Sequence, residues 1–355
     1  MATKTPKMVM TILLDVCIIS QKSQMKISAK TKNNVPEHTA KDAKLPDGSF
    51  VSNMGKQSVC TKIWRYRHFY LFISPFFIFF VLFGLYPLVF SLYLSFAQWN
   101  GLNELRLVGL SNFVNVFTDE YFYISLWNTI VIGLLYIPPM FIGSFILAII
   151  LNLSWLKFRG FFRAAVFLPC VTPMVVVAIV FHLLYGQETG LLNFLIGKMS
   201  NLLPGIELKS IPWLVSEKWS KLSIAILLVW RWTGYNMVLM LAGLQGISKE
   251  YYEAAKIDGA GILKQLWYIT LPLMRPTFVF CSITSLIGTV YMFDEIFVLT
   301  QGGPGSSSTN FGLYLFNKSF NEFKFGQASC MAYVVSLIVF LSSLLILKLR
   351  RTDAE

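Results

Sequence analysis

Residues 253–272 read EAAKIDGAGILKQLWYITLP, a half-polar stretch between two long apolar runs. The chemistry that these residue types offer is recognition of a partner. Ala254 and Ala255 leave a thin helix surface that could enter a groove on another protein, which is a recurring mode of binding. The carboxylate of Glu253 could accept hydrogen bonds from that partner, or it could cap its own helix.

Local signals predict a helix–turn–helix in this stretch. Ser248 can cap a helix over 249–257, because its hydroxyl can accept a hydrogen bond from a free amide of the first turn. Gly259 and Gly261 should end that helix, since glycine tolerates the left-handed conformation that a tight turn needs. A second short helix is expected over 262–269.

Two prolines are expected to separate this loop from the apolar run that follows. Pro272 should end the second short helix and Pro276 should begin the next long one, because proline is tolerated in the first turn of a helix but not in its interior. The predicted loop therefore covers residues 245–276.

The elements around this loop are predicted membrane spans. Apolar residues make up 55% of the 355-residue chain and charged residues 14%, whereas about a quarter of a soluble domain is charged. A helix needs about 20 apolar residues to cross the hydrocarbon core, where its backbone must satisfy its own hydrogen bonds. The sequence therefore predicts an all-α polytopic membrane protein. Six spans are expected, over 70–96, 124–151, 164–186, 222–244, 277–299 and 328–348.

The distribution of Lys and Arg predicts the orientation. The loops 152–163 and 245–276 and the C-terminal end are basic, whereas 97–123 contains Arg106 alone. Both termini and the 245–276 loop are therefore expected in the cytoplasm. The formal net charge of +12 reflects this bias and a basic N-terminal tail, so no nucleic-acid partner is expected.

The N-terminal region differs from the rest of the chain. It is basic and has little apolar periodicity, so a disordered cytoplasmic tail is expected. Residues 8–20 resemble a weak signal-peptide core, but Asp15 interrupts the run. Translation from Met54 is an alternative that would leave a short basic leader. The predicted domains are 1–68, the tail; 69–351, the membrane domain; and 352–355, the C-terminal end.

The spacing within the loop resembles a known family motif. Glu253-Ala254-Ala255 is followed after three residues by Gly259 and after nine more by Ile269-x-Leu271-Pro272. This pattern is similar to the EAA loop of bacterial ABC importer permeases. The resemblance covers roughly 69–351, and it is specific for the carbohydrate-importer branch, which includes the maltose and glycerol-3-phosphate permeases. The segments that carry it, besides the loop, are 162–186, 234–261 and 293–309.

The resemblance implies a membrane transport subunit, not an enzyme, in the bacterial inner membrane. In this family the EAA loop is a coupling helix that sits in a cleft of a cytoplasmic ATPase. The implied partners are membrane lipid, a second permease subunit, an ATPase dimer that carries ATP and Mg, and an extracytoplasmic solute-binding protein. No cofactor or metal is expected on this chain, which lacks the G-x-x-x-x-G-K-[ST] phosphate loop. The implied coupling residues are Glu253, Ala254, Ala255, Asp258, Gly259, Ile269, Leu271 and Pro272.

Polar residues inside apolar runs are candidates for function, because their burial in lipid is costly. Arg231 could line a translocation path or snorkel as an interfacial anchor; as the one intramembrane cation, it favours a neutral sugar over a polyol phosphate. Asp294 and Glu295 could pair with Arg231, bind sugar hydroxyls or hold the turn at 300–310. Sugars stack on aromatic rings and bond to amides and carboxylates. The candidate path residues are Tyr185, Trp232, Tyr235, Asn236, Tyr291 and Asp294.

The segment QGGPGSSST, 301–309, contains glycines and a proline that force turns. The resemblance places Gly302, Gly303 and Pro304 on a surface that the binding protein touches. The other interpretation is a plain loop that returns the chain to the last helix.

Two other function classes fit the sequence less well. A secondary transporter driven by an ion gradient would need carboxylates near the membrane midplane and internal repeats, and the acidic pair lies near one end of its run. A membrane-embedded enzyme would need a cluster of His, Asp or Glu, and the three histidines are scattered. The secondary transporter is kept as the alternative to an importer permease.

Overall fold

The computed structural model describes residues 67–153, 156–202 and 209–352. The chain divides into two compact units, Met1–Phe77 and Ile78–Glu355. The predicted N-terminal tail up to residue 66, with its apolar run and Met54, lies outside the described residues.

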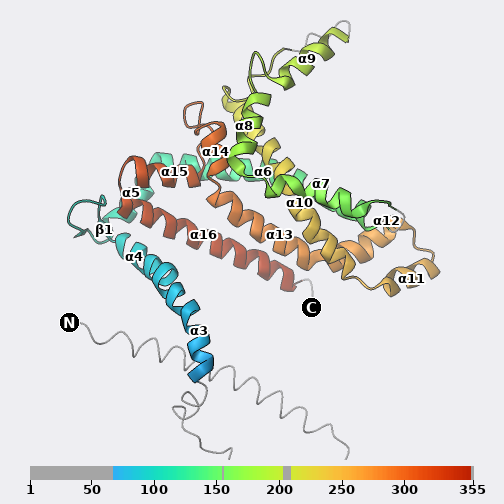
Figure 1. Cartoon of the computed structure of the whole chain (residues 1–355), viewed down its shortest axis with the longest axis horizontal. Coiled ribbons are helices and arrows are strands. Elements are labelled where there is room, and N and C mark those ends of the chain that lie inside the picture. The colour runs from blue at the N-terminus through green and yellow to red at the C-terminus, as the bar shows by residue number, and fades with distance from the viewer. Residues whose placement is uncertain (1–66, 154–155, 203–208, 353–355) are drawn as a thin grey trace, which may run out of the picture. The chain divides into compact units, whose positions relative to one another are not determined.

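Helices dominate the described part of the chain, as Figure 1 shows. Two-residue strands form a small antiparallel hairpin in which Ala97 faces Leu107. Within the residues that the structure describes, three π-helical turns, labelled η, continue α-helices. The elements are α3 (Arg67–Phe80), η2 (Val81–Leu85), α4 (Tyr86–Leu94), β1 (Ala97–Gln98), β2 (Arg106–Leu107), α5 (Ser111–Thr118), α6 (Glu120–Asn152), α7 (Arg159–Val171), α8 (Met174–Leu184), α9 (Leu191–Leu202), α10 (Glu217–Gln245), α11 (Lys249–Ile257), α12 (Ile262–Gln265), η3 (Leu266–Thr270), α13 (Leu271–Tyr291), α14 (Asp294–Leu299), α15 (Phe311–Phe316), η4 (Asn317–Asn321) and α16 (Phe325–Thr352).

The helical runs confirm the predicted fold class. Within the described residues, five runs are long and apolar enough to cross a membrane, and the bent pair of α7 and α8 would make a sixth. The five are Arg67–Leu94, Glu120–Asn152, Glu217–Gln245, Ile262–Tyr291 and Phe325–Lys348.

The core lies where α6, α10 and α13 pack together, with α16 beside α13 (Figure 1). One hydrophobic cluster joins α6, α8, α10 and α14 around Met140 and Ile296. A second joins α6 to α15 and α16 around Phe311, and a third joins α6, α10 and α13 around Met237 and Met274. These contacts fix the relative positions of the helices that carry the candidate residues.

The third predicted span is not one helix, contrary to the prediction of a run over 164–186. It breaks between α7 and α8, which meet at 92°. Thr172 has an extended backbone with ψ of 140°, because a residue that precedes a proline is pushed out of the helical region. Pro173 then precedes the first residue of α8.

Arg231 holds this break together. It is the middle residue of α10, and its Nη1 donates hydrogen bonds to the carbonyl oxygens of Thr172, at 2.9 Å, and Pro169, at 3.4 Å. These carbonyls lie at the end of α7, where no further turn of helix supplies them with partners. The guanidinium also lies over the ring of Trp232. Arg231 is therefore held by protein groups at the bend, which the sequence interpretations of path or interfacial anchor did not foresee.

The prediction that Pro272 ends the second loop helix is wrong. The helix runs without a break from Ile262 to Tyr291, and Pro272 lies in the first turn of α13. The π-helical turn η3 precedes it, with the amide of Leu271 bonded to the carbonyl of Leu266. In a π turn each amide bonds to the carbonyl five residues back, which shifts the pairing just before a proline that has no amide hydrogen to donate. The helix therefore accommodates Pro272 and joins α12 directly to the span.

The other end of this span also differs from the prediction of a helix over 277–299. The helix ends at Tyr291, and Asp294 and Glu295 form the first turn of the separate helix α14. Asn310 Nδ2 donates to the Met292 carbonyl, which the break leaves without a helical partner. The break places both carboxylates at the start of a helix, where its dipole favours negative charge.

Candidate functional site: a helical loop and an interior cavity

The helix–turn–helix is built as the sequence predicts at its first end and at its turn. Ser248 Oγ accepts from the amide of Glu250 at the start of α11. Gly259 has φ of +75°. The amides of Ala260 and Gly259 donate to the carbonyls of Ala255, at 2.8 Å, and Lys256, at 3.0 Å, which is the Schellman pattern of a helix that ends on a left-handed residue.

Two side-chain hydrogen bonds that the sequence reasoning missed hold the loop closed. The hydroxyls of Tyr252 and Thr270 lie 3.0 Å apart, which links α11 to η3. Gln265 Nε2 donates to the carbonyl of Ala260 at 2.8 Å. The signal was present in the polar residues at 252, 265 and 270, but their pairing depends on how the two helices fold back on each other. The loop is therefore a cross-linked unit continuous with α13.

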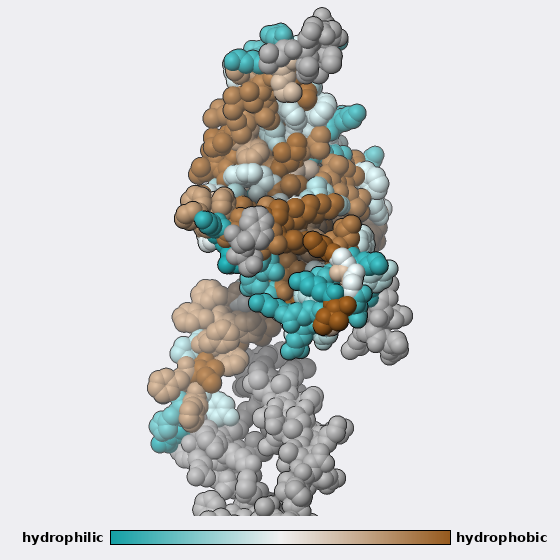
Figure 2. Space-filling view, turned by 90° about the vertical axis from the view of Figure 1, so that its right-hand side faces the viewer, coloured by the Kyte–Doolittle hydropathy of each residue, from teal (hydrophilic) through white to brown (hydrophobic). Residues whose placement is uncertain are grey.

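The outer surface of this unit is open. Glu253, Ala254 and Asp258 are exposed, and Ala255 is half-buried. Within the described part of the chain, no hydrogen bond or ion pair engages the Glu253 carboxylate, so the internal cap is not made. Large apolar side chains are exposed on the same unit, among them Tyr251, Ile257, Ile262, Leu263 and Tyr268, with Ile257 88% accessible. Figure 2 faces this end of the molecule and shows hydrophilic residues gathered beside a broad hydrophobic surface.

The other coupling candidates lie at the base of the unit. Ile269 is the residue before the last in η3, and Leu271 and Pro272 begin α13; all three are half-buried. The base residues therefore belong to the continuous helix Ile262–Tyr291, whereas Glu253 lies on α11 and Asp258 at its C-terminal cap, before the turn that joins α11 to this helix.

A cavity of about 300 Å³, partly open to the surface of this chain, lies between α6, α10, α13 and the start of α14. Five of the six candidate path residues line it: Trp232, Tyr235, Asn236, Tyr291 and Asp294. The structure thus brings together residues from three helices that are separated in the sequence. The remaining lining residues are Tyr136, Met140, Leu228, Thr284, Ser285, Gly288, Met292, Phe293 and Glu295.

The polar groups of the cavity differ in how far they are already paired. The hydroxyls of Tyr136 and Thr289 lie 2.6 Å apart, so Tyr136 has an internal partner. Asn236, only 3% exposed, donates to the carbonyl of Trp232, while its Oδ1 has no hydrogen-bond partner in the described structure. The ring centroids of Trp232 and Tyr235 lie 5.9 Å apart, edge to face. Aromatic faces, an unpaired amide oxygen and carboxylates are groups that can bind a polyhydroxylated molecule.

Tyr185, the sixth candidate, lies elsewhere. It is 1% exposed, its hydroxyl donates to the carbonyl of Ser223 at 2.9 Å, and its ring packs 5.5 Å from that of Trp213. A tyrosine whose ring and hydroxyl are both engaged is typical of a core residue. His182 packs nearby, with Nδ1 3.4 Å from the Leu299 carbonyl. Among the described residues, no group of three or more His, Cys, Asp or Glu side chains could hold a metal ion.

The segment Gln301–Thr309 is a compact turn tied to α6. Gly302 is buried with φ of +86°, and a Cβ there would lie 2.4 Å from Thr309 Oγ1. Gly303 and Pro304 are half-buried, and Ser308 donates to the Gly303 carbonyl. Asn128 Nδ2 donates to the carbonyls of Ser306 and Thr309, each at 2.9 Å. The buried Gly302 therefore determines the shape of the turn from its interior.

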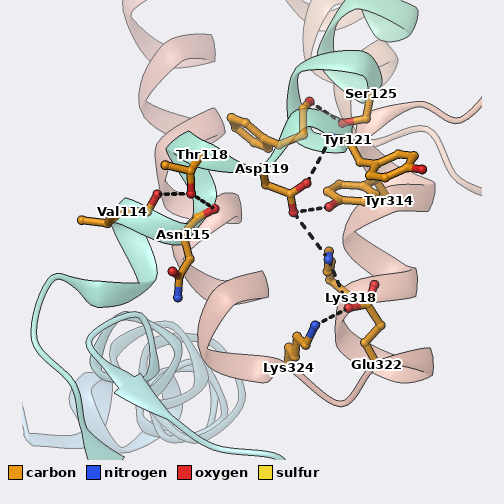
Figure 3. A network of polar contacts seen from close by, with 11 residues as sticks. Val114, Asn115, Thr118, Asp119, Tyr121, Ser125, Tyr314, Lys318, Glu322 and Lys324 are labelled. Atoms are coloured by element: carbon orange, nitrogen blue, oxygen red, sulfur yellow. Dashed lines mark hydrogen bonds and ion pairs between the residues drawn. The ribbon is translucent and has the colours of Figure 1, made fainter.

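A network of charged and polar groups joins the start of α6 to α15 and η4 (Figure 3). Asp119 caps α6 by accepting from the amide of Tyr121, and it also accepts from the hydroxyl of Tyr314. Lys318 lies 3.4 Å from Asp119 and 3.1 Å from Glu322, which also pairs with Lys324. Burial alone would raise the pKa of Asp119, but the Tyr314 hydrogen bond and the Lys318 charge outweigh it, so the pKa is lowered from 3.8.

The lowered pKa gives this network a defined pH dependence. The ionised carboxylate stabilises the fold at pH above 3.8, and that contribution is lost as pH falls through the lower folded value. We expect Asp119→Asn to cost about 1.5–3 kcal/mol at pH 7, the range for a hydrogen bond to a charged group. Thermal unfolding in detergent should show a lower midpoint at pH 7 and a smaller difference from wild type near pH 3.

Glu120→Gln is the matched control, since its carboxylate is the exposed neighbour on the same turn. It should leave the midpoint almost unchanged at both pH values. An Asp119→Asn difference that stays constant from pH 7 to pH 3 would contradict the role given to the carboxylate charge.

A multi-span helical bundle with an exposed helical loop at one end and a partly open cavity between its helices is typical of a membrane transport subunit. Residues 144–351 match the family model described as "Binding-protein-dependent transport system inner membrane component". The chain belongs to this family, and it is therefore the permease of a binding-protein-dependent ABC importer, a transport component and not a catalytic one.

The chain is similar over most of its length to curated permeases. It is 37% identical over 279 residues to the lactose transport system permease protein LacF of Rhizobium radiobacter, covering 78% of this chain and 91% of the relative. It is 35% identical over 282 residues to the arabinooligosaccharides transport system permease protein AraP of Bacillus subtilis, covering 79% and 87%. These matches confirm the predicted resemblance to sugar-importer permeases.

The fold is shared with a solved transporter. A bacterial ABC transporter involved in the import of the acidic polysaccharide alginate superposes with a TM-score of 0.72 at 20% identity, covering 84% of this chain and 100% of that one. At this identity the match concerns the fold.

Proposed function

We propose that this permease forms, with a second permease subunit, the translocation path for a saccharide, and that a separate ATPase dimer drives it. The observation that carries the saccharide is the cavity in which Trp232, Tyr235, Asn236, Tyr291 and Asp294 come together. The names of the relatives LacF and AraP, which refer to lactose and arabino-oligosaccharides, support the same class of cargo.

The loop of α11 and α12 is the proposed contact with the ATPase. Its exposed Glu253, Ala254 and Asp258 and its accessible apolar side chains offer a surface of mixed character, and the turn at Gly259 is held by a Schellman motif. Because η3 and α13 continue the loop without a break, a displacement of the loop would reach Tyr291 at the cavity. Closure of the ATPases on ATP and Mg is thereby converted into movement of a cavity wall.

The orientation follows from this assignment. The loop lies in the cytoplasm together with both termini, and the opposite ends of the spans face the extracytoplasmic binding protein. The turn Gln301–Thr309 is the proposed contact for that protein. Gln301 and Gly305 are the exposed residues of this turn, and Gly303 and Pro304 are half-buried. Gly302 is buried and maintains the shape of the turn.

Transport then proceeds by alternating access. The docked binding protein delivers a saccharide to the opened path, where sugar faces stack on Trp232 and Tyr235 and hydroxyls donate to Asn236 Oδ1 and Asp294. Hydrolysis on the ATPase returns the path to its other orientation. This chain supplies no group to the hydrolysis; it holds the cargo and transmits the movement.

Co-purification tests the assembly. The full chain, tagged at its C-terminus and extracted in mild detergent, should bring with it a second, related permease and an ATPase. Recovery of the chain alone from membranes that take up the saccharide would contradict the proposal.

A further inference from the structure

The cavity contains one group whose environment the proposed stacking and hydrogen bonding do not explain. Glu295 is 8% exposed and lines the cavity, and within the described residues its carboxylate has no ion pair and no hydrogen bond from another side chain; its own backbone amide and the charge of Arg231, which lies beyond ion-pair distance, favour its ionised form. A buried carboxylate without a paired cation is costly and marks a functional position in a membrane protein. Its position at the start of α14, beside Asp294, brings two carboxylates to the same wall.

No Lys, Arg or His is present among the described residues that line the cavity to balance this charge. Arg231 lies on α10, but its Nη1 is engaged by the carbonyls at the bend of α7 and α8, and it is absent from the cavity lining. The charge of Arg231 acts on Glu295 from outside the lining, so the wall presents two carboxylates, Asp294 and Glu295, against one guanidinium that is bonded elsewhere. Carboxylates accept hydrogen bonds from sugar hydroxyls, whereas a like charge placed against them is strongly unfavourable.

We propose that Glu295, supported by Asp294, is a selectivity residue that admits uncharged saccharides to the cavity and disfavours anionic ones such as uronates and sugar phosphates. This inference rests on the proposed saccharide path and adds the charge of the cargo to it. The fold does not decide that charge, since a transporter of the same fold is described as importing an acidic polysaccharide. The charge of the cavity wall does decide it.

A matched pair of ligands separates the effect of the ligand's charge on binding from all other features of the sugar. Methyl α-D-galactoside and methyl α-D-galacturonide differ at C6 alone, and the corresponding glucoside and glucuronide form a second pair. Binding is measured by competition in saturation-transfer NMR on the full chain in nanodiscs, together with the partners that co-purify with it. The extracytoplasmic binding protein is omitted, because it would impose its own selection.

The wild-type protein should bind the uncharged member of at least one pair about tenfold or more tightly than the uronate. Glu295→Gln, which keeps the size of the side chain, should reduce that ratio to about threefold or less, mainly by improving uronate binding. Asp294→Asn should act in the same direction and serves as the second variant if Glu295→Gln does not assemble. Glu217→Gln, an exposed carboxylate at the start of α10, should leave the ratio unchanged.

The outcomes separate this inference from the proposed path. Equal binding of both members, or a ratio that neither variant changes, would overturn the selectivity role while leaving the saccharide path intact. If neither member of either pair binds, and the wild-type protein gives no saturation-transfer signal that is lost in Trp232→Ala, both the selectivity role of Glu295 and the saccharide path are overturned.

Discussion

Replacement of Gly259 by alanine should weaken capture of the ATPase by about 5–30-fold. The reason is conformational: an L-residue in the left-handed region costs about 1–2 kcal/mol, which corresponds to that range in an equilibrium constant. Gly259 has φ of +75°, and a Cβ there would meet nothing within 4 Å in this chain. The strain therefore acts on the turn that presents α11, and it is measured by titrating the ATPase onto the immobilised permease.

Gly261→Ala is the matched control, two residues further along the same turn. Its Cβ would also meet nothing within 4 Å, but its φ is −68°, which any residue adopts. It should bind the ATPase within about twofold of wild type. Equal loss at both positions would show that added bulk, and not the left-handed turn, is what the partner rejects. No loss at either position would contradict the coupling role of the loop.

Replacement of Trp232 by alanine should reduce saccharide uptake by about tenfold or more while the complex still assembles. Trp232 is half-buried and lines the cavity, edge to face with Tyr235. The indole ring is a surface on which a sugar can stack. If its loss removes about 1.4 kcal/mol of binding free energy, the affinity for the saccharide falls tenfold. Uptake is measured in proteoliposomes with lactose and arabino-oligosaccharides as labelled probes, and assembly is measured by size exclusion.

Trp230→Ala makes the same chemical change two residues away on α10. Trp230 is 46% exposed, packs against Phe181 and is absent from the described cavity lining. It should change uptake by less than about twofold. If Trp230→Ala reduces uptake as much as Trp232→Ala, the cavity is not the path.

Local sequence signals were sufficient for the parts of the fold that depend on neighbours along the chain. The cap at Ser248 and the turn at Gly259 lie where the residue types predict them. Few side chains can accept a hydrogen bond from a free amide at a helix start, and few residues other than glycine adopt the left-handed conformation at a helix end. The apolar runs likewise predict the spans, because their length is set by the membrane.

The errors arose where tertiary contacts decide. Pro272 looked like a helix end, but a π turn lets the helix continue through it. The break at Thr172 depends on a proline whose effect was visible in the sequence and on Arg231, whose pairing was not. Tyr185 and Trp232 are both aromatic residues in apolar runs, so the sequence does not distinguish them. Tyr185 belongs to the core because Trp213 and Ser223 pack against it, whereas Trp232 lines the cavity.

We expect this permease to move its cargo on energy supplied by an ATPase and to receive the cargo from a binding protein. The direct measurement is saccharide uptake into proteoliposomes that contain the co-purified complex, with ATP, the binding protein and ion gradients varied separately. Uptake should require both ATP and the binding protein and should persist when ionophores collapse the ion gradients. Uptake by this chain without the ATPase, abolished by ionophores, would contradict the account and identify a secondary transporter.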